Sequence, residues 1–179
     1  MKKHAYLILA HKNPSQLKLL LSLLDDERND IFVHIDKKAA FSEEDLQGCC
    51  SKSQLEFIQP RIRVTWGGVS IINVEVALLK AAARTPHEYY HLLSGQDLPL
   101  KSQDEIHAFF EANSGKEFVG YTSTVMTPEV IRKACRWHLF PDSFRRRNIL
   151  RAAFLRIQEI IGIKRNTGID FKKGSQWVS

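Results

Sequence analysis

Apolar runs separated by polar turns alternate with helical repeats over the first hundred residues. Continuous apolar runs of this kind are typical of parallel strands that are buried on both faces. The three clearest runs are His4–Ala10, Ile31–Ile35 and Tyr89–Leu93. After the first run, leucines recur at the i, i+3, i+4 and i+7 spacing that gives a helix one apolar face. These leucines are Leu17, Leu20, Leu21 and Leu24. Weaker runs predict further strands at Leu55–Ile58, Arg61–Val64 and Phe118–Tyr121.

Polar residues predict where the helices begin. Asn13 is expected to be the N-cap of the leucine helix, with Pro14 at its first position and Gln16 at the capping-box position. Ser70 is expected to cap a helix that runs to about Ala83. A capping box at Ser102–Glu105 predicts a third helix.

Strand–helix–strand units of this length predict an α/β fold, an open and mostly parallel sheet flanked by helices. In such sheets, ligands bind beyond the carboxyl ends of the strands. Polar residues follow the apolar runs at Ala10-His11, Asp36–Lys38 and Ser94–Asp97. From about Thr122 the alternation fades. We therefore expect one domain over 1–179, with an α/β core at 1–121 and a basic helical region at 122–179.

Composition narrows the partners of this domain. The chain has 179 residues and a formal net charge of +6, which favours anionic partners such as nucleoside diphosphates, nucleic acid or acidic lipid. Nucleic acid is disfavoured because the charges are not interleaved with aromatic stacking platforms. Three cysteines without a CxxC pattern indicate free thiols in a reducing, cytoplasmic compartment. The sequence has no Asp-x-Asp pair, and its histidines are not at metal-ligand spacing, so no metal is expected.

Two segments carry the clearest candidate chemistry. The Asp36 carboxylate can accept hydrogen bonds from ribose hydroxyls, and Lys37 and Lys38 suit a diphosphate; the alternative is a solvated end of a strand. Trp66 stands beside two glycines at the start of a helix, where a ring and free N–H groups can approach a ligand. The alternative there is a tight turn around a core tryptophan. His11 either lies on the surface or lines a base pocket.

A basic amphipathic stretch, Phe144–Gly162, has two interpretations. Its arginines can hold the protein at an anionic inner membrane leaflet, near a lipid-linked or envelope glycan. Alternatively, it is a packed helix with a solvated charged face.

Five segments, taken in order, resemble the Core-2/I-branching enzymes, glycosyltransferase family 14. The segments are Ala5–Lys12, Phe32–Lys38, Trp66–Ser70, Leu92–Leu100 and Gly174–Trp177. The resemblance implies a GT-A-like fold that binds a UDP-sugar without a metal. The donor-binding positions would be Leu9, Ala10, His11, Asp36, Lys37, Lys38 and Trp66, together with Asp97 in the Leu92–Leu100 segment. The acceptor-binding positions would be Lys133 and Arg136.

The function implied by this resemblance is an inverting glycosyltransferase that moves N-acetylglucosamine or xylose from a UDP-sugar to a glycan, a lipid-linked saccharide or another hydroxyl acceptor. No cofactor is expected. The family's glutamate base would fall beyond Ser179, so we expect the chain to be the amino-terminal part of a longer enzyme and inactive alone. A catalytically incomplete module that binds a nucleotide sugar is the alternative.

Overall fold

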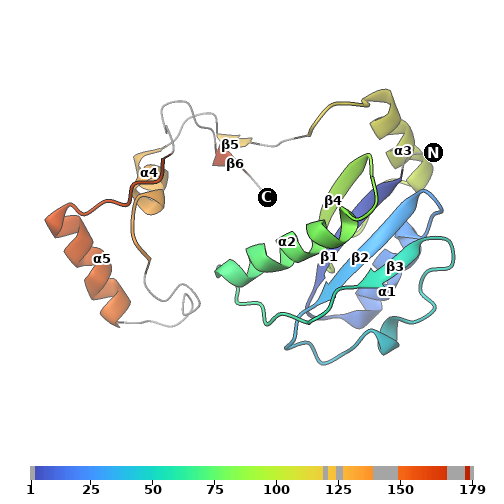
Figure 1. The fold of residues 1–179 in the computed structure, drawn as a ribbon, viewed down its shortest axis with the longest axis horizontal. Coiled ribbons are helices and arrows are strands. Elements are labelled where there is room, and N and C mark those ends of the chain that lie inside the picture. The colour runs from blue at the N-terminus through green and yellow to red at the C-terminus, as the bar shows by residue number, and fades with distance from the viewer. Residues whose placement is uncertain (1–2, 119–120, 124–126, 139–148, 169–175, 178–179) are drawn as a thin grey trace. The chain divides into compact units, whose positions relative to one another are not determined.

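A computed structural model describes residues 3–118, 121–123, 127–138, 149–168 and 176–177 of the chain (Figure 1). The chain divides into two compact units, Met1–Asn113 and Ser114–Ser179. The boundary between these units precedes the 121/122 position at which the sequence alternation fades. That 1–179 form a single domain stays a prediction.

The first unit is built on a four-stranded sheet in the order β3-β2-β1-β4 (Figure 1). Its strands are β1 (His4–Ala10), β2 (Asn29–Ile35), β3 (Gln54–Phe57) and β4 (Tyr89–Ser94). All three strand pairs are parallel. In register, Ala10 lies opposite Ile35 and Leu9 lies opposite Ser94, so these three strands end at the same edge of the sheet. The predicted open α/β sheet is confirmed.

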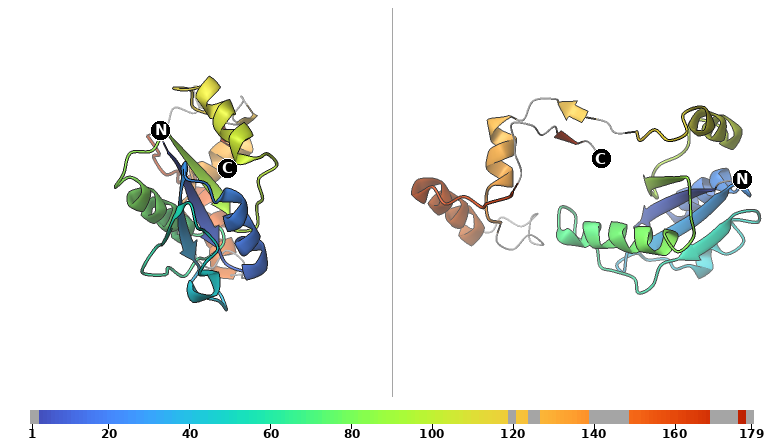
Figure 2. Two further views of the ribbon diagram at one scale, coloured as in Figure 1. Left: turned by 90° about the vertical axis from the view of Figure 1, so that its right-hand side faces the viewer. Right: turned by 45° about the horizontal axis from the view of Figure 1, so that its top comes forward.

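Helices cover both faces of this sheet, because both faces of its strands are apolar. Helix α1 (Pro14–Leu24) covers one face and α2 (Val69–Ala82) the other, as the left view of Figure 2 shows. The four leucines of α1 are completely buried against Tyr6, Ile8 and Ala10 of β1. On the opposite face, Ala5 and Leu7 pack with α2 residues of which Val74, Leu78 and Ala82 are fully buried.

The starts of the helices match the sequence predictions unevenly. The capping box of α3 (Gln103–Ala112) is present, since Ser102 and Glu105 exchange side-chain and backbone hydrogen bonds. Asn13 is the N-cap residue of α1 and Pro14 opens the helix, as predicted, but Asn13 lies in the left-handed region at φ 52° and its side chain forms no capping hydrogen bond. The prediction that Ser70 caps the next helix is wrong, because Gly68 is the N-cap residue of α2.

The second unit contains β5 (Tyr121–Ser123), α4 (Pro128–Ala134), α5 (Ile149–Ile161) and β6 (Gln176–Trp177). Strands β5 and β6 pair antiparallel. Helix α5 confirms the helical periodicity of the basic stretch, whose first residues lie outside the described part. The predicted strand at 61–64 is wrong: that segment is an irregular loop. Of the strand expected at Phe118–Tyr121, Phe118 lies outside any strand, Tyr121 lies in β5, and residues 119–120 lie outside the described part of the chain.

Candidate functional site

Backbone hydrogen bonds attach the loops after β2 and β4 to the end of β1. The Asp36 N–H donates to the Ala10 carbonyl at 2.8 Å, and the Gly95 N–H donates to the Leu9 carbonyl at 2.8 Å. His11 follows β1 directly and is exposed. The strand ends that the sequence analysis singled out are therefore neighbours in space, at the place where open α/β sheets bind ligands.

Asp36 is buried, with 5% of its surface exposed. Its Oδ1 accepts hydrogen bonds from the Lys38 N–H at 2.9 Å and from the Val64 N–H at 3.3 Å. Its Oδ2 lies 3.6 Å from the Lys38 ammonium, which also donates to the Val64 carbonyl. Asp36 thus ties the loop after β2 to the loop before α2. Its predicted contact with a ribose stays a prediction, and in this structure its carboxylate holds neighbouring backbone in place.

Two further side chains fix the same pair of loops. The Arg61 guanidinium donates to the carbonyls of Ile35 at 3.2 Å and Asp36 at 2.7 Å. His34 accepts a hydrogen bond at Nε2 from the Ile62 N–H at 2.9 Å. Burial lowers the pKa of His34, which favours the neutral ring with a lone pair for that bond. Neither Arg61 nor His34 was predicted from the sequence to have a role at this site.

Trp66 lies on the loop before α2, two residues after Val64. Its side chain is 63% exposed, so the alternative of a tryptophan buried in the core is wrong. The turn that carries it is closed by a hydrogen bond from the Thr65 N–H to Ser70 Oγ at 2.8 Å. Gly67, at φ 74°, supplies the left-handed residue that the turn needs. An exposed indole on a fixed turn is suited to stacking on a planar ring or a sugar face.

The Ser94–Asp97 turn forms the third part of this edge. Asp97 Oδ2 accepts from the Ser94 N–H at 2.7 Å, which closes the turn, and the residue itself is exposed. Asn13 Nδ2 donates to Gln96 Oε1 at 3.1 Å, and Gln16 donates to the Gln96 carbonyl. The side chains of Asn13 and Gln16, expected to cap α1, instead hold this turn against the loop after β1.

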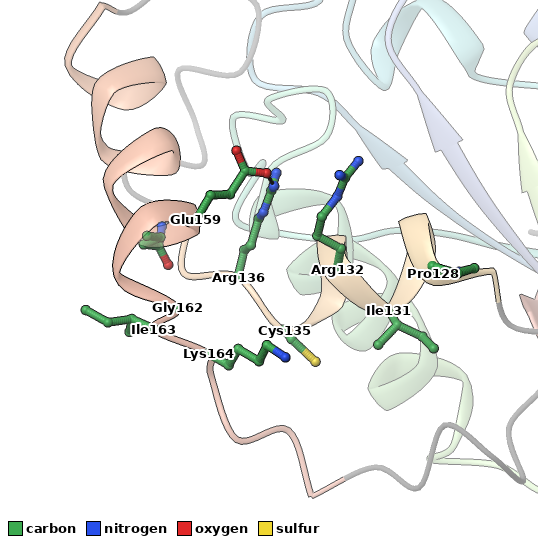
Figure 3. Close-up of a pocket in the computed structure, with 10 residues that line it drawn as sticks. Pro128, Ile131, Arg132, Cys135, Arg136, Glu159, Gly162, Ile163 and Lys164 are labelled. Atoms are coloured by element: carbon green, nitrogen blue, oxygen red, sulfur yellow. Dashed lines mark ion pairs between the residues drawn. The ribbon is translucent and has the colours of Figure 1, made fainter.

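The two acceptor-side candidates lie in the second unit. Lys133 pairs with Glu129 at 2.8 Å on the surface of α4. Arg136 pairs with Glu159 of α5, and Figure 3 shows the two side chains pointing toward one another. A pocket of about 450 Å³ opens here, and Arg132, Arg136, Glu159 and Lys164 are among the residues that line it (Figure 3). Of the two candidates, Arg136 lines this pocket and Lys133 does not.

Within the described residues, no group of three or more His, Cys, Asp or Glu side chains is arranged to hold a metal ion. The same residues contain no helix that is both long enough and apolar enough to cross a bilayer. Lys37 and Lys38, which follow the end of β2, are both exposed. Fixed ammonium groups are one of the ways in which proteins neutralise phosphates.

Comparison with known proteins identifies the family of the chain. The family model for the Core-2/I-Branching enzyme matches residues 4–179. Xylosyltransferase 2 of Rattus norvegicus is 27% identical over 120 residues, which cover 64% of this chain and 14% of the rat protein. The N-acetyllactosaminide beta-1,6-N-acetylglucosaminyl-transferase of Homo sapiens is 28% identical over 131 residues, covering 70% and 31% of the two chains. The chain, which spans less than a third of either relative, belongs to the Core-2/I-branching enzyme family of glycosyltransferases.

Proposed function

We propose that the protein transfers N-acetylglucosamine or xylose from a UDP-sugar to a hydroxyl acceptor, with inversion at the anomeric carbon and without a bound metal. One observation carries the proposal: the ends of β1, β2 and β4 meet at a single edge, joined by the Ala10–Asp36 and Leu9–Gly95 hydrogen bonds. The two relatives described above, a xylosyltransferase and an N-acetylglucosaminyltransferase by name, point to these sugars.

In this proposal the residues at each strand end bind a different part of the UDP-sugar. Leu9, Ala10 and His11 face the uracil, and the Trp66 ring stacks against the nucleotide. Lys37 and Lys38 neutralise the diphosphate, because ammonium groups held close to phosphate oxygens can replace a divalent cation. The Ser94–Asp97 turn at this edge holds the sugar, and Arg136 with Lys133 bind the acceptor.

The transfer itself is a single displacement. The acceptor oxygen forms a bond to the anomeric carbon while the bond from that carbon to the diphosphate oxygen breaks, and UDP leaves with the electron pair. The acceptor's proton passes to a carboxylate, which typically accelerates such a step about 10²–10⁴-fold. Cationic side chains stabilise the charge that develops on UDP. None of the described residues is assigned as that carboxylate.

Titration calorimetry of the chain with UDP tests the donor site. We expect measurable binding that the Asp36→Ala variant weakens at least tenfold, because this change removes the carboxylate that accepts hydrogen bonds from the backbone N–H groups of both Lys38 and Val64. Asp25→Ala is the matched control. The Asp25 carboxylate likewise accepts hydrogen bonds from the backbone of a loop, at Ser51, Lys52 and Ser53, but it follows α1 rather than β2. Equal affinities for UDP in Asp36→Ala and the unchanged chain would show that Asp36 does not contribute to UDP binding.

Repeating the titration in EDTA and then in Mg²⁺ or Mn²⁺ tests metal independence. We expect similar affinities for UDP in all three buffers. Binding that appears with a divalent cation alone contradicts the role given to Lys37 and Lys38. A comparison of UDP-N-acetylglucosamine with UDP-xylose in the same cell then ranks the two donors.

A further inference from the structure

Helix α5 presents a continuous apolar stripe to solvent. Five large apolar side chains of this helix are between 50% and 84% exposed: Ile149, Leu150, Ile157, Ile160 and Ile161. At 3.6 residues per turn these positions fall on one side of the helix. Apolar residues scattered singly over a surface are ordinary, whereas a contiguous stripe marks an interaction surface.

The opposite side of α5 is fixed by specific polar contacts. Gln158 is 3% exposed, and its amide accepts from the Trp137 N–H and donates to the Trp137 carbonyl, each at 2.9 Å. The Arg165 N–H donates to the Cys135 carbonyl at 2.7 Å, just beyond the helix. Ile160 lies about 200° around the helix from Gln158. The contacts of Gln158 and Arg165 therefore hold the isoleucines outward.

The charges around this stripe are almost all positive. From Ile149 to Arg165 the sequence has four basic residues and one acidic residue, Glu159. The basic residues are Arg151, Arg156, Lys164 and Arg165. Glu159 is paired with Arg136, so it does not neutralise the basic residues of its own segment. Arg156, Lys164 and Arg165 are exposed.

We propose that α5 binds the surface of an anionic lipid bilayer, with the isoleucine stripe at the acyl boundary and the basic residues at the lipid phosphates. A helix with a strong apolar stripe and arginines beside it lies in the plane of the interface, and the helix is too short and too polar to span the bilayer. A second copy of the chain suits the stripe less well, because stripe-to-stripe packing brings two basic rims together. Membrane binding by α5 is independent of which sugar nucleotide the first unit binds.

Sedimentation with vesicles tests this surface on the full chain. The vesicles contain phosphatidylcholine alone or phosphatidylcholine with one quarter phosphatidylglycerol. We expect binding to the anionic vesicles that raising NaCl to 0.5 M weakens. Ile157→Ser/Ile160→Ser should lower the partition coefficient at least tenfold. The matched control is Ile72→Ser/Val76→Ser, which removes two exposed apolar side chains from α2 and should leave vesicle binding unchanged.

Circular dichroism checks that the stripe variant keeps its helices. Should it not fold, Arg156→Glu serves in its place, since this exposed change reverses one charge and leaves the stripe intact; it should weaken binding several-fold. Three results overturn the proposal. These are equal binding to both kinds of vesicle, full binding by a folded stripe variant, or a dimer in solution that the stripe variant loses while neither protein binds vesicles.

Discussion

Lowering the pH from 6.5 to 4 is expected to destabilise the first unit by about 2–4 kcal/mol, even after the partial solvent access of its histidines is discounted. Three histidine rings from β1, β4 and α3 pack together there. His91 Nε2 lies 3.2 Å from His4 Nδ1, and the ring centres of His4 and His107 are 4.2 Å apart. His4 is 2% exposed, whereas His91 and His107 are half-buried. Protonating any ring in this cluster places a charge where little water can reach it.

The direction of the effect follows from the pKa values. Burial, and next the His107 ring, lower the pKa of both His4 and His91 from 6.5 to about 4. Burial and Arg28 lower the pKa of His107, against the opposing pull of Asp26 and Asp104. Glu88 also faces the cluster and opposes the shift of His4. The unfolded chain therefore takes up protons near pH 6.5 and the folded chain near 4, so stability is complete above 6.5 and falls as the pH drops.

Urea unfolding followed by circular dichroism at pH 7, 6, 5 and 4 measures this loss. His91→Gln keeps a group that can hydrogen-bond to His4 but cannot titrate, so it should flatten the dependence on pH. His11→Gln, a change in an exposed ring outside the cluster, is the matched control. The Asp25 and Asp26 carboxylates, whose pKa values are held near 2, contribute a loss only below about pH 4. A stability that is constant between pH 6.5 and 4 contradicts the prediction.

Apolar periodicity predicted the fold because burial alone decides it here. The continuous run of β1 pairs on both sides, with β2 and β4, and the leucines of α1 are buried where their spacing placed them. The hydrophobic pattern does not predict which of several possible partners a polar side chain will bond to. Asn13 has the right type for an N-cap, yet its amide bonds to Gln96, 83 residues away in the sequence. Long-range polar contacts of this kind leave no trace in a local window of sequence.

In the candidate site, too, the strand ends could be predicted from the sequence and the long-range polar contacts could not. The sequence predicted that Ala10, Asp36 and Ser94–Asp97 lie at one edge, because the end of each strand is visible as a break in an apolar run. The parallel pairing of β1 with β2 and β4 brings these ends together. The residues that hold this edge in shape were not visible. Arg61 stands in a segment that resembles a strand, and His34 lies inside a buried run, so neither shows from sequence that it bonds to a neighbouring loop.

Replacing Gly95 by valine is expected to destabilise the first unit by about 1–3 kcal/mol, the usual effect of overpacking, and to weaken UDP binding at least tenfold. A Cβ atom at this position would lie 3.1 Å from the β-carbon of Ala10, 3.2 Å from its α-carbon and 3.5 Å from the Leu9 carbonyl oxygen. Two of these three atoms are backbone atoms of β1, which pairs with strands on both sides and has little freedom to move. The Ser94–Asp97 turn must then lift away from the strand end.

A graded series separates this steric effect from a general loss of stability. Gly95→Ala introduces the Cβ alone and should be milder than Gly95→Val in both urea unfolding and UDP titration. Ala10→Gly/Gly95→Ala removes the methyl group of Ala10, the nearest of the crowded atoms, but leaves the backbone of β1 in place. The loss of stability in the double variant is therefore expected to be smaller than the sum of the losses in Ala10→Gly and Gly95→Ala. Because the two methyl groups meet only in this packing, strictly additive effects in the double variant would show that the turn does not lie against Ala10. Full stability and full UDP binding in Gly95→Val would contradict both the packing and its place in the site.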